Sequence, residues 1–296
     1  MKTAKAIRDF YDNLVLELRP HYQREEAQTI CRWLLEDITG LDAFKLSQAW
    51  TRAFNAPERK RFQKARQRLL SGEPIQYVLG QAHFYGRKFE VSPVVLIPRG
   101  ETEELMIWAR DTMIQNQSSN RHWDILDIGT GSGCIAISLQ LELAQRQIAT
   151  QITGVDISEP ALQIAKNNTH RLQSEVRFEQ MDILAAAQAH FQAQDILISN
   201  PPYIPAIEKQ EMARHVTAHE PALALFVSDH DPLLFYRQII FLAESWLRKG
   251  GYLFFEIHEE MGKAILALFH ETHWDTPLIR QDIHGKERMI RGRKRS

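Results

Sequence analysis

The sequence has little of several features that would mark a special class of protein. Its 296 residues include only two cysteines, Cys31 and Cys134, which excludes a disulfide framework. No apolar run reaches membrane-spanning length, and the charged first residues lack the apolar core of a signal peptide. A formal net charge of -1 gives no chain-wide attraction to nucleic acid or anionic membrane. These absences favour a globular protein with a cytoplasmic location.

Residues 1–80 show helical patterns and none that is typical of catalysis. Apolar residues recur at spacings of three and four, as in Ile7, Phe10 and Leu14. The strongly basic segment 59–68 is interpreted as a solvated helix face in preference to a partner-binding patch. We expect residues 1–80 to form a helical domain that docks a substrate.

Two further changes of pattern follow along the chain. In residues 81–100, aromatic and β-branched residues flank the turn-like sequence YGRK, which predicts a β-hairpin connector. In residues 101–296, apolar strands alternate with helical patterns. The predicted strands are 124–128, 151–155, 175–179, 195–199, 252–257, 277–283 and 287–292, and the predicted helices are 134–146, 159–172, 232–247 and 259–269.

This alternation determines the expected fold class. Strands joined by helices imply right-handed crossovers and a sheet covered on both faces. We therefore predict an open, doubly wound α/β sheet of seven mostly parallel strands, preceded by the helical domain and the hairpin.

A glycine-rich loop follows the first strand of the predicted sheet. In DIGTGSGCIAIS, Gly129, Gly131 and Gly133 alternate just before a helix. Glycines permit a tight turn and a close approach of the backbone to a ligand, and the helix start offers free amide hydrogens. A ligand-free turn is the less favoured interpretation. Since Gly131, Gly133 and Ala136 also satisfy the dinucleotide pattern, NAD competes here with S-adenosylmethionine.

Two later strands end in residues that suit an adenosine group. Asp156 ends the second strand, where a carboxylate accepts hydrogen bonds from ribose hydroxyls of either cofactor. Asp182 and Ile183 end the third strand, where they are predicted to meet the amino group and the ring of adenine. A helix N-cap at Asp182 is an equally favoured interpretation.

The fourth strand ends in the sequence NPPY. Asn200 is biased towards an extended backbone by the proline after it. Pro201 and Pro202 fix two φ angles and contribute carbonyls without competing donors. The Asn200 side-chain oxygen and the Pro201 carbonyl are therefore predicted to accept both hydrogens of a planar –NH₂ group. Tyr203 is predicted to stack on the flat substrate.

Several stretches together resemble the release factor glutamine methyltransferase family over nearly the whole chain. That family methylates the side-chain nitrogen of the Gly-Gly-Gln glutamine in peptide-chain release factors. The stretches that carry the resemblance are GEPIQYVLGQAHFYG, VLIPRGETEEL, ILDIGTGSGCIAI, ISNPPYI, HEPALALF and QDIHGKERMIRGR.

The resemblance implies a cofactor, a substrate and the residues that hold each. S-adenosylmethionine is implied to contact Gly129, Thr130, Gly131, Ser132, Gly133, Asp156, Ile183 and Asn200. The glutamine is implied to be held by Asn200, Pro201, Pro202 and Tyr203. Because NPPY also occurs in amino-group methyltransferases of DNA and RNA, a nucleic-acid amino group or a ribosomal-protein glutamine stays the alternative substrate. Direct nucleic-acid binding is expected to be absent or secondary.

Two positions depart from the family pattern. Gly100 stands where a second proline is common in IPRPETE, and His258 stands where EIG would place a glycine. We expect the first departure to loosen the loop that carries Glu101 and Thr102, and the second to alter packing near the cofactor.

Two weaker patterns carry less chemistry. His215 and His219 are four residues apart, but no third ligand accompanies them, so no metal site is expected. The basic end GKERMIRGRKRS is interpreted as a last strand with a solvated tail, and contact with ribosomal RNA or a partner is the alternative.

Overall fold

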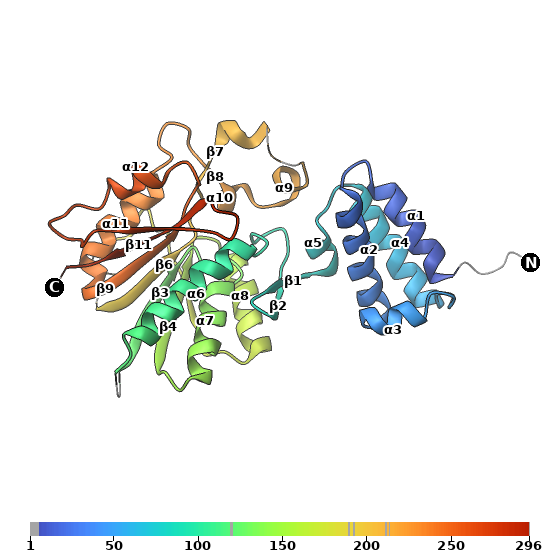
Figure 1. Cartoon of the computed structure of the whole chain (residues 1–296), viewed down its shortest axis with the longest axis horizontal. Coiled ribbons are helices and arrows are strands. Elements are labelled where there is room, and N and C mark those ends of the chain that lie inside the picture. Colours follow the sequence, from blue (N-terminus) through green and yellow to red (C-terminus); the bar gives the residue numbers. More distant parts are fainter. Residues whose placement is uncertain are drawn as a thin grey trace, which may run out of the picture. The chain divides into compact units, whose positions relative to one another are not determined.

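The computed structural model describes residues 6–118, 121–188, 190–191, 193–210, 212 and 214–295. The chain divides into two compact units. One unit is Met1–Gly80 with Ala213–His219, and the other is Gln81–Met212 with Glu220–Ser296. Figure 1 shows the elements of both. Within the described ranges, none of the helices has the length and hydropathy needed to cross a bilayer.

The first unit is a group of helices around its own apolar core. Its helices are α1 (Ile7–Leu18), α2 (Arg24–Thr39), α3 (Ala43–Gln48), α4 (Ala56–Leu70), α5 (Ile75–Leu79) and α9 (Arg214–His219). Helix α4 starts with a capping box, because the Asn55 side chain accepts from the Glu58 N–H at 2.8 Å and Glu58 accepts from the Asn55 N–H at 2.9 Å. The inner faces of α1, α2 and α4 supply buried Leu14, Leu34 and Phe62.

The second unit is built on a seven-stranded sheet of order β10-β11-β9-β6-β3-β4-β5. Strand β11 runs antiparallel to its neighbours β9 and β10, and the other neighbouring pairs are parallel. The strands are β3 (Trp123–Ile128), β4 (Thr150–Asp156), β5 (Arg177–Gln180), β6 (Gln194–Ser199), β9 (Leu247–Glu256), β10 (Leu278–Gln281) and β11 (Glu287–Arg293).

Helices cover both faces of this sheet (Figure 1). They are α6 (Gly100–Gln115), α7 (Cys134–Gln145), α8 (Glu159–Leu172), α11 (Leu234–Trp246) and α12 (Gly262–Leu266). Alternate residues of each strand point to opposite faces, so Ile196 and Ile198 of β6 pack in the core under α6 and α7. Leu197, between them, packs in the core under α11. Because β6 is buried on both faces, it appears in the sequence as an unbroken apolar run.

The remaining elements are short. Strands β1 (Gln81–Phe84) and β2 (Arg87–Glu90) form an antiparallel hairpin, and β7 (Ile204–Pro205) pairs with β8 (Phe226–Val227). A 3₁₀ helix (Ala206–Gln210) and α10 (Ala222–Leu225) also lie in the long connection from β6 to α11, as does α9 of the first unit.

The predicted fold class is confirmed, with differences in detail. The predicted helix 259–269 is reduced to α12, Gly262–Leu266, and the strand predicted to start at residue 252 starts at Leu247. Helix α6 and the short elements between β6 and α11 are additional to the predicted set.

Candidate active site

The site lies where the direction of the sheet topology changes. Strand β3 has β4 on one side and β6 on the other, and all three are parallel. Ligands in open α/β sheets bind outside the carboxyl ends of the strands at such a switch point. The glycine loop follows β3 and Asn200 follows β6, and a Cβ atom placed on Gly129 would lie 4.0 Å from the Asn200 carbonyl oxygen. The fold thus brings the two main predicted motifs together.

A cavity of about 250 Å³ opens between these loops. Its wall includes eight of the predicted site residues: Gly129, Gly131, Asp156, Asp182, Ile183, Asn200, Pro201 and Pro202. Further apolar wall comes from Val94, Ile157, Leu184 and Leu223, which are all partly exposed. The cleft is therefore not filled by core side chains.

The glycine loop is tied to the end of β4. Gly129 and Gly131 have φ angles of 73° and 54°, in the left-handed region that favours glycine. The N–H of Gly129 donates to the Val155 carbonyl at 2.8 Å, and the N–H of Gly131 donates to Asp156 Oδ2 at 2.9 Å. Asp156 Oδ1 accepts from the Ser158 N–H at 2.9 Å. Each carboxylate oxygen still has lone pairs to offer a ribose hydroxyl.

Burial and hydrogen bonding act in opposite directions on Asp156. Burial raises the pKa of this carboxyl group, while the N–H groups of Ser158, Gly131 and Ile157 stabilise its charged form. The net shift is upward.

Three predicted loop residues lie outside the cavity wall. Thr130 and Ser132 are buried at 4% and 3% exposure. The Thr130 hydroxyl donates to Asp127 Oδ2 at 2.6 Å. A Cβ atom on Gly133 would lie 3.0 Å from side-chain atoms of both Ile137 and Phe178. These residues shape the loop from within.

Asp127 is a residue that the sequence reasoning missed. It is fully buried, and burial raises its pKa to about 7. Hydrogen bonds from the Thr130 hydroxyl and the Ala136 N–H oppose this upward shift. An acidic residue two positions before the first glycine of the loop was the available signal.

Asn168 of α8 is a second missed residue, and it fastens the glycine loop to the hairpin. It is fully buried, and its Nδ2 donates to the carbonyls of Ser132 and Glu90, both at 3.0 Å. Its Oδ1 accepts from the Glu90 N–H at 2.6 Å. A fully satisfied buried amide of this kind rigidifies the surrounding backbone.

Replacing Asn168 with alanine is expected to lower the free energy of unfolding by about 2 kcal/mol, because three backbone groups lose their partner. The neighbouring Asn167 is exposed and is the matched control. Its replacement with alanine is expected to change stability by less than about 0.5 kcal/mol. Urea unfolding measures both; equal effects of the two changes would contradict the assigned role of Asn168.

Asp182 lies at the start of a turn, and no helix follows this turn in the described residues before β6. Its Oδ1 accepts from the Leu184 N–H at 2.9 Å, two residues on. The helix N-cap interpretation is therefore wrong, since no helix stands between β5 and β6 in the described part of the chain. Asp182 and Ile183 both face the cavity.

The loop after β6 presents two unoccupied acceptors. Asn200 Nδ2 donates to Thr102 Oγ1 at 3.1 Å, which leaves Oδ1 as the other end of the amide. Within the described ranges, neither Asn200 Oδ1 nor the Pro201 carbonyl accepts a hydrogen bond. Both residues belong to the cavity wall.

Tyr203 follows this pair in the chain and is not part of the cavity wall. Its hydroxyl donates to Glu256 Oε1 at 3.1 Å, and burial raises the pKa of its phenol. Thr102 and Glu256, its neighbours in this network, were not predicted as site residues. Stacking of Tyr203 on a substrate stays a prediction.

The two residues that depart from the family pattern, Gly100 and His258, differ in what they contact. His258 packs edge-on against the Tyr203 ring, with centroids 6.2 Å apart, and its Nε2 is 3.3 Å from Glu208 Oε2. Gly100 is the first residue of α6, and a Cβ atom placed on it would meet no atom within 4 Å.

Replacing Gly100 with proline is expected to stabilise the protein. Proline suits the first helical position, and Arg99 before it already has the extended backbone that proline demands, with φ -106° and ψ 151°. We expect a gain of about 0.4–1 kcal/mol from the reduced freedom of the unfolded chain. Thermal unfolding should show a higher Tm; a lower Tm would mean that the loop needs the freedom of glycine.

Of the histidine pair, both backbones lie in α9, but the side chain of His215 is outside the described residues, so the expectation of no metal site stays a prediction. The described residues contain no group of three metal-ligating side chains.

Comparison with known proteins assigns the chain to a family. Residues 119–286 match the family model described as Methyltransferase domain, and residues 13–80 match the one described as PrmC N-terminal domain. Several curated relatives are named release factor glutamine methyltransferase. The one from Bacteroides thetaiotaomicron is 39% identical and aligns over 92% of this chain and 95% of its own length. Those from Flavobacterium psychrophilum and Streptococcus pneumoniae are 41% and 32% identical, with 75% and 98% of this chain and 76% and 98% of their own lengths aligned.

The sheet order, the glycine loop at the switch point and the matched domain define a methyltransferase. Within that class, the chain belongs to the release factor glutamine methyltransferase family.

Proposed function

We propose that this enzyme methylates the side-chain amide nitrogen of the glutamine in the Gly-Gly-Gln motif of peptide-chain release factors, with S-adenosylmethionine as methyl donor. Family membership supports the reaction. The structural observation that carries it is the pair of unoccupied acceptors, Asn200 Oδ1 and the Pro201 carbonyl, at the wall of the glycine-lined cavity.

The acceptor pair suits a primary amide. A planar –NH₂ group has two hydrogens, and each acceptor takes one of them. Acceptors fixed in advance stabilise the positive charge that grows on the nitrogen as the new carbon–nitrogen bond forms. Holding the nitrogen in line with the methyl group is worth up to about 7–11 kcal/mol when the geometry is near ideal. Since the nitrogen becomes acidic only as the bond forms, no strong general base is required.

The residues of the cavity fit the cofactor. The space beside Gly131 is free of protein atoms within 4 Å of its Cβ position, so the loop backbone accepts a close neighbour there. Asp156 would hold the ribose, while Asp182 and Ile183 would meet the adenine. When bound, S-adenosylmethionine supplies an electrophilic methyl group on a sulfonium centre. Partly exposed Ile157, Leu184 and Leu223 would exclude water from the ring.

The first unit is proposed to dock the protein substrate. It has its own core, and residues 13–80 match a family model of their own. A chain that begins at residue 81 and shows a folded spectrum by circular dichroism is expected to methylate a short Gly-Gly-Gln peptide but to have a raised KM for the intact factor. Equal KM values for full and shortened chains would remove this role.

The reaction is tested by mapping the methyl group. The full chain is incubated with labelled S-adenosylmethionine and a release factor, and mass spectrometry locates the label. We expect a single methyl group on the motif glutamine and none on a factor whose motif glutamine is replaced with alanine. In parallel incubations, DNA or ribosomal proteins take the place of the release factor. Label only on DNA or on a ribosomal protein would replace the proposed substrate with that one.

A further inference from the structure

A chain of buried hydrogen bonds leads away from Asn200. Thr102 Oγ1 accepts from Asn200 Nδ2 at 3.1 Å and lies 2.6 Å from Glu256 Oε2. Thr102 and Glu256 are exposed by only 3% and 1%. The three residues come from the start of α6, the end of β6 and the end of β9, which are far apart in the sequence.

The chemistry of the groups fixes the direction of these bonds. A carboxylate only accepts, so the single hydrogen of the Thr102 hydroxyl goes to Glu256. Thr102 Oγ1 can then only accept a hydrogen bond from Asn200. The Asn200 atom that faces Thr102 must therefore be the donor Nδ2 and not Oδ1. In the reversed amide, Asn200 Oδ1 would face a second oxygen with no hydrogen between them. The network thereby selects the amide orientation in which Nδ2 faces Thr102 and Oδ1 is left for the cavity.

Further groups hold the carboxylate itself. Tyr203 donates to Glu256 Oε1 at 3.1 Å, and the Tyr236 hydroxyl of α11 donates to the Glu256 backbone carbonyl at 3.0 Å. The Arg288 guanidinium of β11 attracts the carboxylate, and Glu101 of α6 repels it. Each oxygen of the Glu256 carboxyl group thus has a hydroxyl partner.

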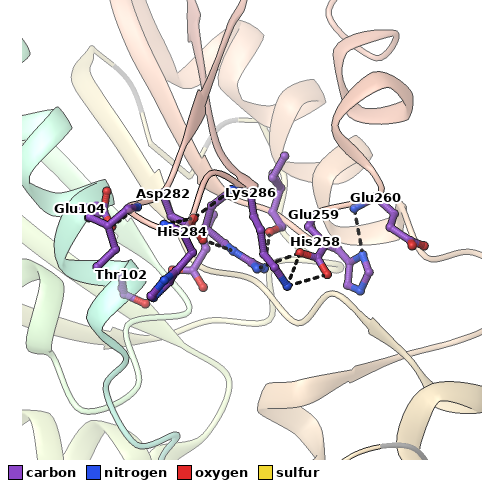
Figure 2. A network of polar contacts seen from close by, with 12 residues as sticks. Thr102, Glu104, His258, Glu259, Glu260, Asp282, His284 and Lys286 are labelled. Atoms are coloured by element: carbon purple, nitrogen blue, oxygen red, sulfur yellow. Dashed lines mark hydrogen bonds and ion pairs between the residues drawn. The ribbon is translucent and has the colours of Figure 1, made fainter.

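Arg288 is in turn held in place by contacts of its own. Its Nη1 donates to the Ile257 carbonyl at 3.3 Å, and its Nε lies 3.4 Å from Asp282 Oδ2. Figure 2 shows Glu104 of α6 beside the loop of Asp282, where the Ile283 N–H donates to Glu104 Oε1 at 3.1 Å. The β10–β11 loop thus joins α6 to the cation that faces Glu256.

We propose that Thr102 and Glu256 are positioning residues for methyl transfer, which fix the Asn200 carboxamide so that Oδ1 accepts from the substrate amide. The proposal rests on the proposed function for its substrate, but the orientation of Asn200 is a property of the protein alone.

The arrangement carries a pH dependence with a definite sign. Burial raises the pKa of Glu256, against the opposing effects of Thr102, Tyr203 and Arg288. A proton on Glu256 removes an acceptor, and the Thr102 hydroxyl is then free to donate to Asn200 Oδ1 and turn the amide. Methyl transfer is therefore expected to fall as the pH drops through the raised pKa.

Variants of Thr102 and Glu256 test the proposal in the full chain. Thr102→Val keeps the shape of the side chain but has no hydroxyl; it is expected to lower kcat about 10- to 100-fold, with cofactor affinity nearly unchanged. Thr102→Ser keeps the hydroxyl and should restore most of the rate. Glu256→Gln should lower kcat similarly and remove the acid limb of its pH profile.

Thr112→Val is the matched control, because Thr112 is also a buried threonine of α6, at 2% exposure. Its hydroxyl donates to the Trp108 carbonyl and accepts from Arg291, away from Asn200. This variant is expected to keep the parent kcat. A parent-like kcat in Thr102→Val, or equal losses in Thr102→Ser and Thr102→Val, would overturn the proposal.

A second measurement needs no substrate. The Asn200 side-chain NH₂ signal in a nitrogen-15 NMR spectrum, identified by its loss in Asn200→Asp, should exchange slowly with solvent in the parent and in Thr112→Val. It should exchange quickly in Thr102→Val. If release factor is not methylated but the exchange difference is present, the proposed function fails and the positioning role stands; equal exchange in all three proteins overturns the positioning role itself.

Discussion

Replacement of Asn200 with alanine is expected to lower kcat about 100- to 1,000-fold and to change cofactor affinity by less than about fivefold. The variant loses one of the two acceptors at the cavity wall, and with it the group that we propose to face the growing positive charge on the substrate nitrogen. The Pro201 carbonyl and the glycine loop stay in place, because they are backbone features. The loss should therefore appear mainly in kcat.

The measurement separates chemistry from binding. Methyl transfer is followed at saturating release factor, and cofactor affinity is followed by calorimetry on the same preparation. Asn167→Ala, an exposed asparagine of α8, is the control and should match the parent in both. If cofactor affinity fell by the same factor as kcat, the effect of Asn200 would lie in cofactor binding, and the proposed hold on the amide would be contradicted.

The fold could be predicted where local signals coincide with burial. The predicted helix 159–172 has the bounds of α8, where Ser158 Oγ accepts from the Ala161 N–H at 3.3 Å and Pro160 stands in the first turn. Strands β3 and β6 are buried on both faces and so are rich in apolar residues, with Ile196, Leu197 and Ile198 consecutive in β6. Helix α6 gives a weaker signal, since Thr102 and Thr112 interrupt its buried stripe.

In the site, only the residues that directly follow predicted strands could be predicted from the sequence. Parallel strands end at one edge, so the glycine loop, Asp156 and Asn200 were expected to meet there, and the structure places them around one cavity. Thr102 and Asn168 gave no such signal. Thr102 reaches Asn200 from 98 residues away, and Asn168 reaches Ser132 from 36 residues away, each through packing of helices on the sheet. A buried polar residue in a helix does not reveal its partner in the sequence.

Replacement of Gly131 with leucine is expected to lower cofactor affinity about 100-fold or more, which corresponds to about 2.7 kcal/mol of binding free energy. Gly131 belongs to the wall of the cavity of about 250 Å³, and its Cβ position meets no protein atom within 4 Å. A leucine side chain there would extend into the space that the cofactor needs. The same change also costs stability, since φ at this residue is 54°.

Gly86→Leu separates these two effects. Gly86 lies in the turn between β1 and β2 with φ 69°, and its Cβ position is equally open. Both leucine variants should lose about 1–2 kcal/mol of unfolding free energy from the left-handed backbone, but only the Gly131 variant should lose affinity for S-adenosylmethionine in calorimetry. Because the two variants share the backbone penalty, a parent-like affinity in Gly131→Leu would place the cofactor somewhere other than beside the glycine loop.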